Sequence, residues 1–377
     1  MNDVAHNDGS SEQGGRRVMI MAGGTGGHVY PALAVANWLR EHRHEVVWLG
    51  TRAGIEARVV PAAGFPIEWV HVSGLRGKSL STWLTAPVRL VRALLEAWSA
   101  VRRRRPHVVL GMGGFVTGPG GVAAWLLRIP LLVHEQNAIA GLSNRLLAHV
   151  AMQAFEAFPG SFKPARAAQL LGNPVRDDIE ALAPPGERLA GRANPRRMLV
   201  LGGSLGARTL NLMVPAALAL LPPERRPLVR HQSGARGLEQ AQAAYAEHAV
   251  DGEVTPFIED MAEAYGWADL VLCRAGALTI AEVTATGVAA ILVPYPFAVD
   301  DHQAHNGRAM VDAGAALMVR DDAVDGPSLA KLLGELFADP QRLEQMAERS
   351  RALAYRGATR ALAMACVDAA ERRGVAA

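Results

Sequence analysis

The chain has 377 residues, half of them hydrophobic, which is enough for about two domains with buried cores. Its formal net charge of +3 is too small to indicate a nucleic-acid-binding protein. Its two cysteines, Cys273 and Cys366, indicate neither a disulfide framework nor a zinc site, and a reducing cytoplasm is the expected compartment.

The first residues are polar and rich in Gly, Ser and Asn, and they lack the apolar core of a signal peptide. We expect a disordered tail over 1–16. No uncharged apolar run reaches the roughly 18 residues of a membrane span. The best candidate, 120–133, is interrupted by Arg128 and Pro130. The chain is therefore expected to be soluble or peripheral to a membrane.

Short apolar runs alternate with longer amphipathic segments through the first half of the chain. Runs of this length, rich in Leu and β-branched residues, are typical of strands buried on both faces of a parallel sheet. The runs are 18–21, 46–49, 67–72, 108–110 and 131–133, and the helix-like segments between them include 32–40 and 120–127. This alternation predicts an α/β domain with a doubly wound sheet over 17–171.

Turn residues cluster over 172–196 and predict a linker. The alternation restarts after it and predicts a second domain over 197–350, followed by a C-terminal helix over 351–377 that can cross back to the first domain. The second set of predicted strands is 198–201, 228–232, 254–257, 270–273, 290–293 and 316–319. Ligands bind such sheets at the carboxyl ends of their strands, so we expect one site in the cleft between two facing domains.

The first predicted strand leads into a turn with four glycines among the five residues 23–27, followed by His28 and Pro31. Glycine lets the backbone turn sharply and approach a ligand closely. A strand, a glycine turn and a helix N-terminus together favour a polar or anionic ligand. A structural explanation is also open, since any doubly wound fold needs a tight first turn.

Two familiar nucleotide motifs do not fit. A dinucleotide fingerprint would require a third glycine at Val29 and an acid at the end of the second strand, where the chain reads Trp48-Leu-Gly-Thr. A P-loop ending in Gly77-Lys-Ser would need its first glycine at Val72. The sequence also lacks a Cys/His cluster typical of a transition-metal site.

A second glycine turn follows the predicted strand 270–273. Gly276 and Thr279 suit a helix N-terminus whose free amides bind a diphosphate. Glu282 lies one turn further along, where a carboxylate can accept two hydrogen bonds from a ribose diol. It can equally be an acid favoured by the helix dipole.

Six motifs in this order resemble the MurG family, glycosyltransferase family 28, over about residues 17–360. They are Ala22-Gly-Gly-Thr-Gly-Gly-His28, Gly111-Met-Gly-Gly-Phe-Val, His134-Glu-Gln-Asn137, Gly172-Asn-Pro-Val-Arg176, Gly202-Gly-Ser204 and Cys273-Arg-Ala-Gly-Ala-Leu-Thr-Ile-Ala-Glu282. The resemblance implies a GT-B fold with two Rossmann-like domains facing across a cleft. It implies an inverting transfer of N-acetylglucosamine from UDP-N-acetylglucosamine to lipid I, giving lipid II in peptidoglycan synthesis, without a cofactor or a nucleotide-binding metal site.

The resemblance also implies site residues. Those for the donor are Thr25, Gly26, Gly27, Asn137, Arg176, Ser204, Ile258, Ala277, Leu278, Thr279, Ile280, Ala281, Glu282 and Gln303. Within this set Ile258 would meet the uracil, Ala277–Glu282 the phosphates and ribose, and Gln303 the sugar hydroxyls. The chain departs from the family at Leu205, where a glutamine is usual, and at Phe297, where a polar residue or histidine is common.

Attack by the acceptor's C4 hydroxyl requires a base, because an alcohol is a poor nucleophile. His28 is our first candidate, since it lies beside the glycine turn that faces the cleft. The adjacent His134 and Glu135 are the second candidate, with a loop-ordering role as the alternative. The turn around Gly113, Gly114 and Phe115 is expected to bind the acceptor's diphosphate.

Basic and apolar residues alternate between 70 and 106 at helical spacing. A basic amphipathic segment with tryptophan can lie in a membrane interface. We expect membrane contact from Leu75, Leu80, Trp83 and Leu84, and packing against the sheet from the later stretch 91–98. These expectations, with a polyprenyl-linked acceptor, predict a peripheral enzyme on the cytoplasmic face of the bacterial inner membrane, bound to anionic lipids.

Two other interpretations remain open. One is another GT-B enzyme of sugar nucleotides, such as a UDP-sugar 2-epimerase, which has no need of a basic, apolar surface. The other is a catalytically silent membrane adaptor that keeps the nucleotide fold, against which the presence of His28 and Glu282 argues.

Overall fold

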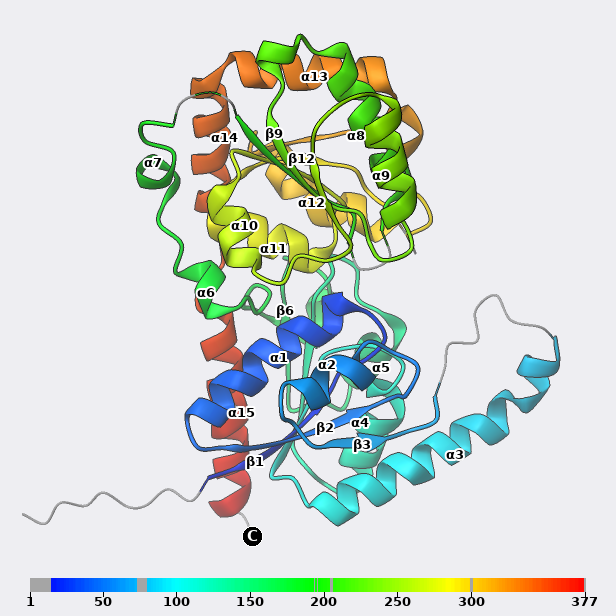
Figure 1. Cartoon of the computed structure of the whole chain (residues 1–377). Coiled ribbons are helices and arrows are strands. Elements are labelled where there is room, and N and C mark those ends of the chain that lie inside the picture. Colours follow the sequence, from blue (N-terminus) through cyan, green and yellow to red (C-terminus); the bar gives the residue numbers. More distant parts are fainter. Residues whose placement is uncertain are drawn as a thin grey trace, which may run out of the picture.

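The computed structural model describes residues 15–72, 80–192, 194, 196–203, 206–298 and 301–375, with the side chains of 80–85 and 373–375 left out. Two parallel β-sheets, each covered by helices on both faces, lie one above the other (Figure 1). This is the predicted α/β architecture with two doubly wound domains. Most of the predicted tail, residues 1–14, lies outside the described part, as do the predicted site residues Ser204 and Leu75.

The first sheet has the strand order β3-β2-β1-β4-β5-β6-β7, and every neighbouring pair is parallel. Its strands are β1 Arg17–Met21, β2 Glu45–Gly50, β3 Ile67–Trp69, β4 Val108–Gly111, β5 Leu131–Glu135, β6 Gln153–Glu156 and β7 Gln169–Leu170. The order reverses between β1 and β4, so the turns that follow these two strands lie side by side at the switch point where such sheets bind ligands.

The second sheet repeats this plan in the order β10-β9-β8-β11-β12-β13, again parallel throughout. Its strands are β8 Arg197–Leu201, β9 Leu228–Gln232, β10 Glu253–Thr255, β11 Leu270–Cys273, β12 Ala289–Leu292 and β13 Ala316–Met318. Its switch point lies between β8 and β11, which places the turn before Ala277 there.

Helices connect the strands. In the first half they are α1 Gly26–Glu41, α2 Glu56–Ala62, α3 Leu80–Arg104, α4 Thr117–Leu126 and α5 Leu142–Leu147. Two short helices, α6 Asp177–Glu180 and α7 Pro185–Arg188, lie in the connection between the sheets. In the second half they are α8 Arg208–Leu220, α9 Leu238–Glu247, α10 Met261–Trp267, α11 Ala277–Thr286, α12 His302–Asp312, α13 Gly326–Ala338, α14 Pro340–Ala352 and α15 Ala358–Val375.

Alternation along the strands builds two cores on each sheet, because successive side chains point to opposite faces. Val18 and Ile20 of β1 join the core under α1, whereas Met19 and Met21 join the core under α3 and α4. The second sheet divides in the same way, with Met198 and Val200 on one face and Leu199 and Leu201 on the other.

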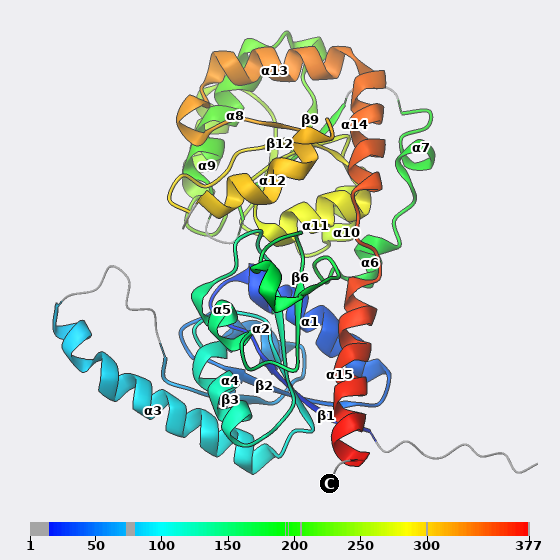
Figure 2. The same ribbon diagram turned by 180° about the vertical axis from the view of Figure 1, so that it is seen from behind.

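Helix α15 leaves the second half of the molecule after α14 and packs along the first sheet, as both views show (Figures 1 and 2). Five of its apolar residues are buried in the core that also holds Val18 and Ile20: Leu362, Ala363, Cys366, Ala369 and Ala370. Helix α15 follows α14 of the second half but buries its apolar surface on the first half, so it connects the two halves.

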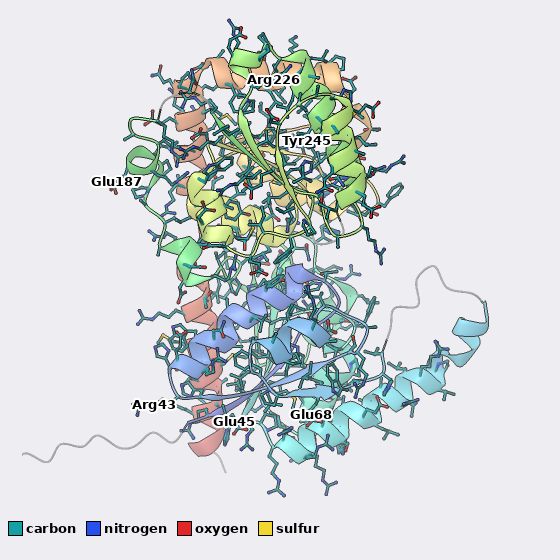
Figure 3. All side chains as sticks on the ribbon, in the orientation of Figure 1. Arg43, Glu45, Glu68, Glu187, Arg226 and Tyr245 are labelled. Carbon is teal, nitrogen blue, oxygen red and sulfur yellow. The ribbon has the colours of Figure 1, made fainter. Side chains whose placement is uncertain are left out.

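Helix α3 lies on the α4 side of the first sheet, and its N-terminal end extends away from the body (Figure 1). At its C-terminal end Arg103 and Arg104 pair with Glu68 of β3, and Arg104 Nε lies 2.7 Å from a carboxylate oxygen. Figure 3 labels Glu68. The sequence interpretation of 91–98 was partly wrong. Ala93 and Ala97 are buried, and Leu94 and Trp98 pack against the same core as expected, whereas Val91 and Leu95 are exposed.

Candidate active site

The glycine turn after β1 is held by a buried carboxylate. Glu56 of α2 is fully buried and accepts hydrogen bonds from Gly24 N at 2.9 Å and from Thr51 N and Oγ1 at 3.0 and 2.6 Å. It therefore ties the turn to the end of β2. Glu56 is not recognisable as a site residue from the sequence, because an acid at the start of a helix has a local explanation in the helix dipole.

His28 lies in the first turn of α1, not in a loop before the helix. The helix predicted from residue 32 begins at Gly26 in the structure, and Pro31 lies inside it. His28 is half-buried, and its Nδ1 lies 2.9 Å from Gln136 Oε1. The predicted donor residues Thr25, Gly26 and Gly27 precede it at the N-cap and the first two helical positions.

The glycine turn after β4 touches the turn after β1. Gly113 and Gly114 both have left-handed backbone conformations, with φ of 93° and 84°. A Cβ on Gly114 would lie 2.3 Å from the carbonyl oxygen of Gly23, so only glycine permits this approach. Phe115 is 57% exposed beside them. The residues predicted for the acceptor therefore adjoin those predicted for the donor sugar.

His134 and Glu135 belong to the buried end of β5. His134 Nε2 lies 2.9 Å from the carbonyl oxygen of Gly172, and burial lowers the pKa of His134 to about 4. Glu135 accepts hydrogen bonds from Asn137 N, Gly141 N and Asn144 Nδ2 at 2.9, 3.0 and 2.9 Å. Because these contacts order the loop 136–141, the geometry favours His28 as the candidate base.

Asn306 of α12 reaches from the second half of the molecule into this loop. Its Oδ1 accepts from Ala138 N at 2.8 Å, and its Nδ2 lies 3.2 Å from Ala275 O and 3.4 Å from Asn137 Oδ1. It is fully buried. Asn306 is not recognisable from the sequence, since nothing in its neighbourhood along the chain signals a partner 168 residues away. The predicted sugar ligand Asn137 is thus positioned by both halves.

Replacing Asn306 by alanine should destabilise the protein, because it leaves the partly buried Ala138 N and the buried Ala275 O without these partners. The expected loss is about 1–3 kcal/mol of the free energy of unfolding, measured by chemical denaturation. Asn37, a partly exposed asparagine of α1 that accepts from Arg40, is the matched control. Equal stabilities of the Asn306→Ala and Asn37→Ala variants would contradict this role.

The N-terminus of α11 lies at the second switch point. Gly276 is its N-cap, and Ala277, Leu278 and Thr279 form its first turn. The first amides of a helix have no partner within it, and the helix dipole favours negative charge there. The predicted diphosphate residues are therefore at a helix end suited to an anion.

Glu282 is buried one turn further along α11. Its Oε2 accepts a hydrogen bond from the hydroxyl of Tyr265 at 3.0 Å, and its Oε1 lies 3.9 Å from Arg176. Burial raises the pKa of Glu282 to about 7, against the opposing effects of Arg176 and Tyr265. Burial also raises the pKa of Tyr30 on α1. The charge of Arg176 lowers this pKa and that of Glu282 raises it, so Tyr30 of the first half lies within the electrostatic influence of Glu282 of the second. Tyr265 is another site residue that the sequence alone does not indicate.

The remaining predicted donor residues lie around α11. Ile258 packs against the core beneath α11, and Gln303 Oε1 accepts from Tyr295 N at 2.9 Å. Phe297, one of the departures from the family, is 81% exposed and packs edge to face on Tyr295. Ile280 is buried, and Ala281 is partly buried. The described residues include no cluster of three or more metal-ligating side chains.

Comparisons with known proteins show the family of this chain. The N-terminal domain model of glycosyltransferase family 28 matches residues 18–156, and the C-terminal domain model of that family matches 197–361. A UDP-N-acetylglucosamine–N-acetylmuramyl-(pentapeptide) pyrophosphoryl-undecaprenol N-acetylglucosamine transferase from Marinobacter nauticus is 54% identical, over 94% of this chain and 98% of its own. The relative with the same name from Nitrosococcus oceani is 55% identical, over 94% and 99%.

Solved structures give the same result. MurG from Acinetobacter baumannii is 39% identical, covers 94% of this chain and 99% of its own, and superposes with a TM-score of 0.80. A UDP-GlcNAc 2-epimerase from Neisseria meningitidis, 14% identical over 94% of this chain and all of its own, shares the fold alone, with a TM-score of 0.64. This chain belongs to glycosyltransferase family 28 and, within it, to the MurG family of N-acetylglucosamine transferases.

Proposed function

We propose that this chain transfers N-acetylglucosamine from UDP-N-acetylglucosamine to the C4 hydroxyl of the N-acetylmuramic acid of lipid I, giving lipid II in peptidoglycan synthesis. The observation that carries the proposal is the pairing of two switch-point sites. His28 lies at that of the first sheet, and Glu282 with the α11 N-terminus lies at that of the second.

The donor's nucleotide fits the second sheet. The amides of Ala277–Thr279 receive the diphosphate, Glu282 accepts the ribose hydroxyls, and Ile258 meets the uracil through its backbone. Arg176, 3.9 Å from Glu282, supplies a cation near the diphosphate. Ser204, outside the described residues, stays a predicted diphosphate contact.

The donor sugar and the acceptor fit the first sheet. Asn137, Thr25–Gly27 and Gln303 surround the sugar in this assignment. Because Gln303 Oε1 is occupied by Tyr295 N, its amide NH₂ is left to donate to a sugar hydroxyl. Gly113, Gly114 and Phe115 receive the acceptor's diphosphate in this assignment, and Phe115 is the exposed member of the three.

The reaction then needs one proton transfer and one displacement. The C4 oxygen of the acceptor forms a bond to the anomeric carbon while the bond from that carbon to the β-phosphate oxygen breaks, and UDP departs. His28 takes the proton of the C4 hydroxyl. The helix N-terminal amides and Arg176 balance the charge that develops on UDP.

We infer that one face of the first half meets the cytoplasmic surface of the inner membrane and its anionic lipids. Helices α3, α4 and α5 are neighbours on this face. Each exposes apolar side chains: Val88, Leu90, Val91 and Leu95 on α3, Trp125 and Leu126 on α4, and Leu142 and Leu146 on α5. Arginines flank the apolar positions of α3 at 89 and 92. Apolar residues beside basic ones favour the interface of an anionic membrane. No described helix is long and apolar enough to span a membrane.

Glutamate at Leu95 should weaken binding to vesicles that contain anionic lipid. Withdrawing one leucine side chain from an apolar environment costs roughly 1.5–3 kcal/mol, so we expect at least about tenfold weaker partitioning in a vesicle sedimentation assay. Leu220, 58% exposed on α8 of the other half, is the control position. Equal partitioning of Leu95→Glu and Leu220→Glu would show that α3 is not the contact. Leu80, Trp83 and Leu84 remain predicted contacts, since their side chains lie outside the described part.

The function is tested by incubating the protein with UDP-N-acetylglucosamine and a short-chain lipid I analogue. We expect UDP and the disaccharide lipid to form in equal amounts and only when both substrates are present. Conversion of the donor without acceptor would indicate an epimerase, and no reaction of either substrate would indicate an adaptor.

A further inference from the structure

A chain of hydrogen bonds runs from the connection between the two halves to His28. Gly172 O lies 2.9 Å from His134 Nε2, and His134 Nδ1 lies 3.1 Å from Gln136 Nε2. Gln136 Oε1 then lies 2.9 Å from His28 Nδ1. His134 and Gln136 are both buried, so each must satisfy its polar atoms within the protein.

The carbonyl oxygen of Gly172, the first acceptor of this chain, determines which atom donates and which accepts in every following hydrogen bond. A carbonyl oxygen only accepts, so His134 Nε2 must donate to Gly172. Burial lowers the pKa of His134 to about 4, so the ring is neutral near pH 7 and its Nδ1 is an acceptor. Gln136 therefore turns its NH₂ group toward His134 and its Oε1 toward His28.

A second contact fixes the same orientation of the Gln136 amide. Its Nε2 also lies 3.3 Å from the carbonyl oxygen of His134. Rotating the amide by half a turn would bring Oε1 against that carbonyl, placing two acceptors together without a proton between them. Since Oε1 only accepts, His28 Nδ1 must carry a proton.

The glycine turn after β4 encloses this bond. A Cβ on Gly113 would lie 2.8 Å from His28 Nδ1 and 3.3 Å from Gln136 Oε1. The turn thus packs directly on the two atoms of the hydrogen bond and limits movement of the ring. Gly172, where the chain of hydrogen bonds begins, is also fixed in place, because a Cβ on Gly172 would lie 2.1 Å from the Cβ of Tyr355.

We propose that Gln136 is a positioning residue that holds His28 in the tautomer with its proton on Nδ1, leaving Nε2 as the ring nitrogen that takes the proton of the acceptor hydroxyl. Among the described residues His28 Nε2 has no hydrogen-bond partner. Without an acceptor at Nδ1, a neutral imidazole can carry its proton on either nitrogen, and a proton on Nε2 blocks that atom as a base. The proposal rests on the proposed function, in which His28 is the base.

The tautomer can be observed without any turnover. In the full-length protein labelled with ¹⁵N-histidine, the signals of His28 are identified as those lost in a His28→Ala variant. We expect a protonated Nδ1 and an unprotonated Nε2 at pH 7.5. A wild-type His28 with its proton on Nε2 would overturn the proposal whatever the activity.

The variant Gln136→Met keeps the length of the side chain but removes its hydrogen bonds to His28 Nδ1, His134 Nδ1 and His134 O. We expect a mixture of His28 tautomers. The kcat should fall by up to roughly 10²-fold, which is part of the roughly 10²–10⁴-fold that a positioned base contributes. The KM for UDP-N-acetylglucosamine should stay within about twofold of wild type. Gln153→Met is the matched control, because Gln153 bonds to Gln169 at an exposed position of the same sheet. It should change neither the spectrum nor kcat.

The variant Gln136→Glu separates positioning from general disruption. Its carboxylate still accepts from His28 Nδ1 but cannot donate to His134, so we expect the His28 tautomer to be retained. Loss of the Nδ1 proton in both variants would overturn the proposal. If instead the spectra agree with expectation while His28→Ala retains wild-type turnover, the tautomer assignment stands and the base of the proposed function is wrong.

Discussion

Replacing His28 by alanine should lower turnover by roughly 10²–10⁴-fold, the contribution of a positioned general base. The loss is expected in kcat, because the acceptor hydroxyl then lacks a group to take its proton. Binding of UDP should change little, since the nucleotide-binding residues in our assignment lie on α11 and around Arg176 rather than on α1. Steady-state kinetics with the lipid I analogue and calorimetric titration with UDP measure the two quantities.

His42 provides the control for this substitution. It lies at the opposite end of α1, is exposed, and stacks on Trp38. His42→Ala should retain wild-type turnover. Turnover of His28→Ala within a few-fold of wild type would exclude His28 as the base and favour the buried pair His134 and Glu135 in β5.

The sequence predicted the sheets because their central strands are continuous apolar runs. Strands β6 and β7 were not predicted, since Gln153–Glu156 contains polar residues at both ends and Gln169–Leu170 has only two residues. These strands lie toward one side of the sheet, where burial is incomplete and the apolar signal weakens. The start of α1 was misplaced because glycine disfavours helix interiors, although the N-terminal turn tolerates it.

The sequence located both switch-point turns, because glycine-rich turns after apolar strands are local patterns. It did not find the buried polar residues that support them, namely Glu56, Gln136, Tyr265 and Asn306. Their roles depend on partners distant in the chain, such as His28 for Gln136, 108 residues away. No periodicity or spacing reports such contacts, and only the fold brings the atoms together.

The Glu282→Gln variant should bind UDP-N-acetylglucosamine much more weakly at pH 8. Wild-type Glu282, whose pKa is raised to about 7 by burial, is largely ionised at that pH and can accept both ribose hydroxyls. A glutamine at 282 still accepts from Tyr265 but lacks the charge, and a hydrogen bond to a charged group contributes about 1.5–3 kcal/mol. We expect KM for the donor to rise roughly tenfold or more, with a smaller change in kcat.

The same carboxylate predicts a pH dependence of binding. As pH falls through 7, Glu282 takes up a proton and loses acceptor strength, so the wild-type KM should rise toward that of Glu282→Gln. The variant should lack this component. Glu247→Gln, at an exposed position on α9, should retain the wild-type profile.

The free energy of unfolding should depend on pH in the opposite sense to donor binding: it should rise as pH falls. A carboxyl whose pKa is higher in the folded state than in the unfolded one binds more protons when folded, so the free energy of unfolding falls as pH rises between the two values. For Glu282 that window runs from about 4.5 to about 7. Above it the buried charge costs on the order of 3 kcal/mol, because a tenfold change in proton affinity corresponds to about 1.4 kcal/mol.

Glu282→Gln should therefore be more stable than wild type at pH 8 and should lose that advantage as pH approaches 4.5. Denaturation curves at the two pH values measure the difference. A glutamine at 282 would make the fold more stable at pH 8 than the glutamate does. The presence of a carboxylate there is therefore explained by its use in binding the donor. If Glu282→Gln were more stable yet bound the donor as well as wild type, the burial would be confirmed and the ribose would have to bind elsewhere.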